Sequence, residues 1–149
     1  MYRRTIKAIR HTGIAVSNLE NSLHFYGTLL GLKLIKMDEE GGSYISKLCD
    51  IPAGKSDIIT AKLAADDGNL IELIQYGAFH DRLVVKSEMS WTQTCHIAFP
   101  VDNIKAEYER LSKTGVEFLS EPQISPDGYA KVVFCRDPDG IYIELVEVL

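Results

Sequence analysis

Two histidines and two glutamates stand at matching places along the chain and could together hold a metal ion. His11 and His96 each begin a short apolar segment, whereas Glu72 and Glu144 each interrupt one as Ile-Glu-Leu. Imidazole and carboxylate groups are typical ligands of Zn, Ni, Co, Mn and Fe. Taken singly, each residue could equally be a structural histidine or a glutamate on a solvated face. Two buried carboxylates would repel each other, however, and a divalent cation would neutralise both.

An internal repeat relates the four positions. Residues 11–19 align with residues 96–104, and the histidine, a valine and an asparagine recur as identities. Residues 67–73 align with residues 139–145, with five identities in seven positions. Matches in the same order indicate two copies of one structural unit.

The repeat predicts two modules within a single domain that spans residues 1–149. The modules cover about residues 6–77 and 92–149, and a linker at 78–91 joins them. A chain of this length buries roughly 68–70% of its unfolded surface, which is enough for a stable core.

Each module is predicted to be βαβββ, which places the chain in the α+β class. The helices are expected to begin after the cap residues Ser17 and Asp102 and to stop at Gly31 and Gly115. An additional short helix is expected around residues 43–49. The expected strands are 9–16, 33–37, 58–63 and 70–76 in the first module, and 94–101, 117–119, 130–135 and 142–148 in the second.

Strand alternation puts each histidine on a face with small residues. Successive side chains of a strand point to opposite faces. The residues that share a face are His11, Gly13 and Ala15 in one strand and His96, Ala98 and Pro100 in the other. Small neighbours leave room, so a cavity is expected beside each histidine. A pseudo-twofold pairing of the modules would bring both histidines and both glutamates around one divalent cation.

Composition and charge exclude several classes of partner. The chain has 16 basic and 21 acidic residues and a net charge of −5, which argues against nucleic acid as a partner. It lacks the ~20 consecutive apolar residues of a membrane span. Its three cysteines show no Cys-x-x-Cys spacing, which suggests a reducing compartment. We therefore expect a cytoplasmic protein.

Several motifs give the chain a resemblance to the vicinal oxygen chelate superfamily, which includes glyoxalases, bleomycin resistance proteins and dioxygenases. The motifs span nearly the whole chain: His11–Val16, Phe25-Tyr26, Leu29–Leu32, Ile71–Leu73, Cys95–Ala98 and Asp137–Leu145. The resemblance implies that the modules pair into an open, glyoxalase-like barrel around one divalent metal. Its ligands would be His11, Glu72, His96 and Glu144, a set closest to those of glyoxalase I and methylmalonyl-CoA epimerase.

The resemblance also implies a reaction. A lyase or isomerase of this superfamily stabilises the enediolate or oxyanion of a small α-oxygenated carbonyl substrate, and Glu144 or Glu72 would transfer the proton. The protein would be lactoylglutathione-lyase-like or epimerase-like, and a homodimer is expected. The alternatives are a non-catalytic binding or resistance protein for an antibiotic or aromatic compound, and a dioxygenase-like enzyme.

Two positions depart from the glyoxalase I pattern. Glyoxalase I typically has an arginine for glutathione at the position of Ala15 and an asparagine at that of Tyr76. A glutathione conjugate is therefore expected to be a poor substrate of this chain.

Overall fold

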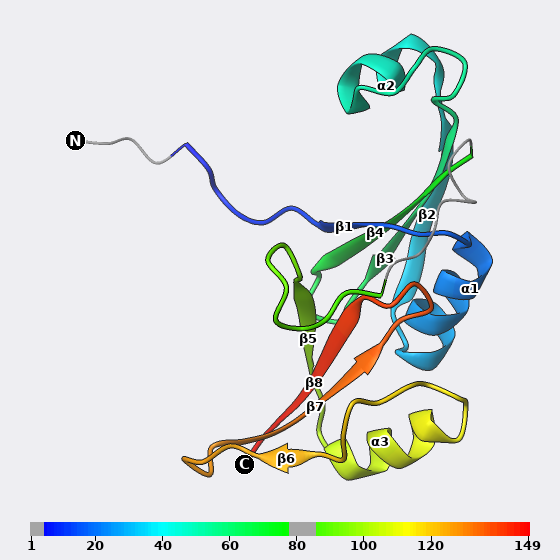
Figure 1. Ribbon diagram of the computed structural model, residues 1–149. Helices are drawn as coiled ribbons and strands as arrows, with labels where there is room; N and C mark the ends of the chain where they lie inside the picture. The colour runs from blue at the N-terminus through cyan, green and yellow to red at the C-terminus, as the bar shows by residue number, and fades with distance from the viewer. Residues whose placement is uncertain (1–4, 78–85) are drawn as a thin grey trace. The chain divides into compact units, whose positions relative to one another are not determined.

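The computed structural model shows two compact units, Met1–Arg82 and Leu83–Leu149, and it describes residues 5–77 and 86–149. Each unit has a four-stranded mixed sheet that does not close on itself, together with helices (Figure 1). The predicted α+β class and the two modules are thereby confirmed. The part of the predicted linker at residues 78–85 lies outside the described residues.

The first unit carries the complete βαβββ pattern and one extra helix. Its strand order is β1-β4-β3-β2, with β1 parallel to β4 and the other pairs antiparallel. The elements are β1 (Thr12–Ala15), α1 (Leu19–Leu23), the π-helix η1 (His24–Leu29), β2 (Lys33–Glu40), α2 (Gly42–Cys49), β3 (Ile58–Ala64) and β4 (Leu70–Tyr76). The strands of 58–63 and 70–76 and the short helix around 43–49 are thus found close to their predicted bounds.

The second unit repeats this topology, with order β5-β8-β7-β6. Its elements are β5 (His96–Pro100), α3 (Ile104–Ser112), β6 (Gln123–Ile124), β7 (Ala130–Arg136) and β8 (Tyr142–Val148). Here β5 is parallel to β8, as β1 is to β4. The two sheets therefore present repeat-equivalent residues at equivalent places.

The two faces of each sheet differ in how deeply their side chains are buried. In the first unit, Leu63 and Leu73 are fully buried on the face that α1 covers. Burying such side chains contributes about 1.5–3 kcal/mol each relative to leaving them exposed. Residues of the other parity, including Glu72, lie on the opposite face. The same alternation holds in the second unit, where Ile143 and Leu145 are buried.

The helix caps lie one residue later than predicted. Asn18 and Asn103 are the N-cap residues, and their side chains accept hydrogen bonds from the backbone N–H groups of Asn21 and Ala106, each at 2.9 Å. Ser17 and Asp102 are therefore not the caps, although both residue types are suitable. Gly31 and Gly115 have φ of +82° and +87°, which confirms the predicted left-handed positions.

One further prediction about the elements was wrong. The strand expected at 117–119 is an isolated bridge between Phe118 and Cys135, and the edge strand of that sheet is β6 instead. The first helix lies where it was predicted, and from His24 it continues as the π-helix η1, whose backbone hydrogen bonds join residues five apart.

In each module, a hydrogen bond joins the first residue of a helix to the last strand. The backbone N–H of Leu19 donates to Oε1 of Gln75 at 2.6 Å, and that of Ile104 donates to Oε2 of Glu147 at 2.8 Å. The acceptors are repeat equivalents that satisfy N–H groups which a helix leaves unpaired at its start.

Removing this acceptor should destabilise the second module. We expect Glu147→Ala to cost about 1–2 kcal/mol of unfolding free energy in urea denaturation, because the N-terminus of α3 loses a hydrogen bond. Glu147→Gln is the matched control, since the first module uses glutamine at this place, and it should stay near wild type. Equal stability of all three proteins would contradict a stabilising role for this hydrogen bond.

None of the helices in the described parts of the chain has the length and apolar character needed to cross a membrane.

Candidate metal centre

The first unit brings His11 and Glu72 together. Nε2 of His11 lies 3.0 Å from Oε2 of Glu72. His11 immediately precedes β1, and the parallel register of β1 and β4 places Gly13 opposite Glu72. The Glu72 side chain is only 14% exposed, so its charge sits in a partly desolvated place where it needs partners.

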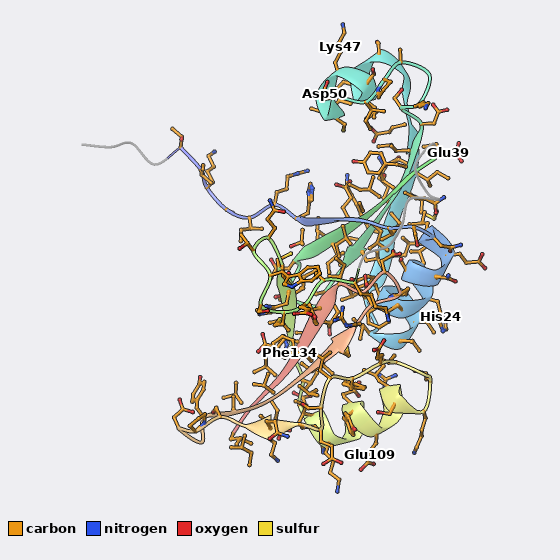
Figure 2. All side chains as sticks on the ribbon, in the orientation of Figure 1. His24, Glu39, Lys47, Asp50, Glu109 and Phe134 are labelled. Carbon is orange, nitrogen blue, oxygen red and sulfur yellow. The ribbon has the colours of Figure 1, made fainter. Side chains whose placement is uncertain are left out.

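The second unit brings His96 and Glu144 together in the same way. Nε2 of His96 lies 3.0 Å from Oε2 of Glu144, and the glutamate side chain is 19% exposed. Ala98 stands opposite Glu144 as Gly13 stands opposite Glu72. The ring of Phe134, labelled on β7 in Figure 2, meets the His96 ring edge-on at 5.3 Å between centroids.

The donor chemistry of both pairs fits a divalent metal. Two donor atoms bound at right angles about 2.1 Å from one metal ion, as in an octahedral site, are about 3.0 Å apart. The imidazole nitrogen and carboxylate oxygen of each pair have this separation. Over residues 5–77 and 86–149, no group of three or more His, Cys, Asp and Glu side chains forms a metal-binding cluster. Each unit presents one histidine–glutamate pair, which is one half of the candidate centre.

Lys62 is a charged neighbour that the sequence analysis did not single out. It lies on β3 directly opposite Glu72, and its Nζ is 3.2 Å from Oε1 of that glutamate. Glu72 is thus held by an imidazole on one oxygen and by an ammonium on the other. The repeat-equivalent residue on β7 is Phe134, which stands opposite Glu144.

Tyr76 lies on the same strand face as Glu72, four residues further along β4. Burial, followed by the neighbouring Cys49 and Glu72, raises the pKa of Tyr76 above its ordinary value. Its hydroxyl therefore stays protonated at neutral pH and is a neutral hydrogen-bonding group. By contrast, burial raises the pKa of the Cys135 thiol to about 12, which makes that cysteine an inert core residue.

Comparison with known proteins assigns the family. Residues 8–145 match the Glyoxalase/Bleomycin resistance protein/Dioxygenase superfamily, and the chain belongs to this superfamily. The resemblance inferred from the motifs is therefore confirmed.

Relatives and solved structures agree with this assignment. A lactoylglutathione lyase of Neisseria meningitidis is 27% identical over 145 residues, which cover 92% of this chain and 88% of the relative. The uncharacterized protein YwbC of Bacillus subtilis is 30% identical and covers 95% and 98% of the two chains. The crystal structure of a glyoxalase family protein from Bacillus cereus has a TM-score of 0.86 at 21% identity and covers 100% and 99% of the chains. This last similarity shows the fold.

Proposed function

We propose that the protein is a divalent-metal-dependent lyase or isomerase that moves a proton at the carbon beside a substrate carbonyl. The observation that carries the proposal is the duplication of one contact, a histidine Nε2 and a glutamate Oε2 at 3.0 Å in each module. Two such halves supply the four ligands His11, Glu72, His96 and Glu144. The relatives named lactoylglutathione lyase support this class of reaction.

The proposed roles follow from residue chemistry. A bound divalent cation would polarise the substrate carbonyl and so acidify the adjacent C–H. His11 and His96 would act as fixed ligands, since neutral imidazole binds metal and carries no charge to repel it. Glu144 or Glu72 would accept the proton and return it, as a carboxylate within hydrogen-bond reach of a substrate can. Gly13 and Ala98, opposite the glutamates, leave space for the substrate.

Metal stoichiometry and proton exchange together test this function. Apoprotein should take up one Co²⁺ or Ni²⁺ per chain in elemental analysis after gel filtration. The loaded protein should then catalyse deuterium wash-in from D₂O at the α-carbon of small oxygenated carbonyl compounds, followed by NMR. A chain that binds no stoichiometric metal, or a loaded protein that exchanges no proton with any such compound, would contradict the proposal.

A non-catalytic binding protein is the second candidate. The exposed aromatic residues favour it, since Tyr44 is 66% and Trp91 49% exposed, and such rings can stack on an aromatic ligand. High-affinity binding of an aromatic compound by metal-free protein would support this candidate. The homodimer and the dioxygenase alternative both remain predictions.

A further inference from the structure

The two halves of the candidate centre differ at one repeat-equivalent position. Lys62 stands opposite Glu72, whereas Phe134 stands opposite Glu144, and the register around them is otherwise the same. The first half therefore carries a positive charge at the place where the second half carries an aromatic ring. Phe134 in the second module shows that this fold accepts an apolar side chain at the position of Lys62.

The ion pair with Glu72 does not by itself explain why a lysine stands at position 62. Glu72 already has an imidazole partner at 3.0 Å, and the Lys62 side chain is 33% exposed. The Lys62 ammonium is therefore open to solvent and to an incoming anion, although Glu72 itself is only 14% exposed. An aromatic residue would pack its ring on the sheet, as Phe134 does against His96.

The neighbouring strand carries a second lysine at this place. Lys36 on β2 stands directly opposite Lys62, and like charges at such cross-strand positions are unfavourable. Lys36 is engaged by Asp38, whose carboxylate lies 2.8 Å from its ammonium. Asp38 is the main reason that the pKa of Lys36 is raised. Lys62 is thus the lysine whose ammonium lies directly at the candidate ligand Glu72.

We propose that Lys62 binds an anionic oxygen of the substrate and so selects a 2-oxo or 2-hydroxy carboxylate over its neutral analogue. This inference rests on the proposed function, in which a metal ion binds Oε2 of Glu72, the oxygen beside His11, and withdraws negative charge from that carboxylate. Oε1 is then a weaker partner for the Lys62 ammonium, whose three N–H donors can also bind an anion at the same place. Since Nζ lies 3.2 Å from Oε1 of Glu72, that anion belongs to the part of the substrate next to the metal-binding oxygens.

The test compares two probes of the same shape that differ in charge. Glycolate and the neutral glycolamide each offer a hydroxyl beside a carbonyl oxygen. Binding of each to Co²⁺-loaded protein is followed by the visible absorption of the cobalt ion. Wild type should prefer glycolate. Lys62→Met should lose roughly ten- to a hundredfold in glycolate affinity, as expected for a lost charge-assisted contact, while glycolamide affinity stays unchanged.

Three further variants make the result specific. Lys62→Arg keeps the charge and should retain most of the glycolate preference, and Lys36→Met, one strand away, should leave it intact. Lys62→Phe introduces the residue that the second module already accepts, so it replaces Lys62→Met if that variant does not fold.

The outcomes separate the two proposals. Wild-type protein without Co²⁺ uptake would contradict the metal-dependent function and, with it, the role of Lys62. Normal Co²⁺ uptake with equal binding of both probes, or with an undiminished glycolate preference in Lys62→Met or Lys62→Phe, would overturn the role of Lys62 alone.

Discussion

Glu144→Gln is expected to abolish stoichiometric metal uptake. The glutamine keeps the size of the side chain but replaces a charged oxygen by an amide, which is a much weaker ligand for a divalent cation. Loss of a residue that merely supports a ligand costs roughly 10–100-fold in metal affinity, so loss of a ligand should cost more than this. Competition against a chromophoric chelator measures the affinity directly and does not depend on any substrate.

The matched control is Glu109→Gln, which removes the same charge from the exposed surface of α3 (Figure 2). Its metal affinity should equal that of wild type. Within the described residues, the ion pair of Glu109 is with Lys105 on the same helix, at 4.0 Å between Nζ and Oε1. A Glu144→Gln protein that binds Co²⁺ as tightly as this control would show that Glu144 is not a ligand.

The glutathione hemithioacetal of methylglyoxal is expected to be a poor substrate. Ala15 is exposed on the strand that follows His11, and it offers neither a charge nor a side-chain hydrogen bond to a glutathione carboxylate. Losing one charge-assisted contact costs about 1.5–3 kcal/mol, or roughly ten- to a hundredfold in affinity. Lactoylglutathione formation by metal-loaded protein should therefore fall well below the diffusional limit of about 10⁸ M⁻¹s⁻¹ for kcat/KM.

Ala15→Arg tests the reason for this expectation. Placing a guanidinium on the exposed face of β1 should raise kcat/KM for the glutathione substrate by roughly tenfold, mainly through a lower KM. Ala15→Gln is the control for side-chain length without charge. Wild-type turnover of the glutathione substrate near the diffusional limit would show that Ala15 and Tyr76 do not restrict it.

The repeat in the sequence predicted the parts of the fold that depend on alternation and periodicity. Strands β4 and β8 have their predicted bounds, because each is a mainly apolar run that Glu72 or Glu144 interrupts. The pairing of each histidine with its own module's glutamate is consistent with the same reasoning. That all four residues bind one metal stays a prediction.

Other features depend on which of several suitable residues forms a cap or a strand pair, and a sequence pattern does not reveal this choice. Ser17 and Asn18 are both good caps, and the residue at which helical backbone begins decides between them. Residues 117–119 have strand-like composition, yet their backbone hydrogen bonds to β7 form only one isolated bridge, that of Phe118 with Cys135. Lys62 became visible as a partner of Glu72 only through the register of β3 on β4, which no local pattern specifies.

The parallel pairing of β1 with β4 has a consequence for folding during synthesis. Thr12 pairs with Ile71, so the first strand finds its neighbour only after about sixty further residues have been made, and such non-local pairing slows folding. At synthesis rates of ≈ 5–20 residues per second, β1 spends seconds as an unpaired segment beside the ribosome. The helix, the hairpin of β3 and β4, and β2 can assemble first, and β1 then enters along one side of β4. His11 precedes that strand, so the candidate ligand pair of the first module cannot form before β4 has been made.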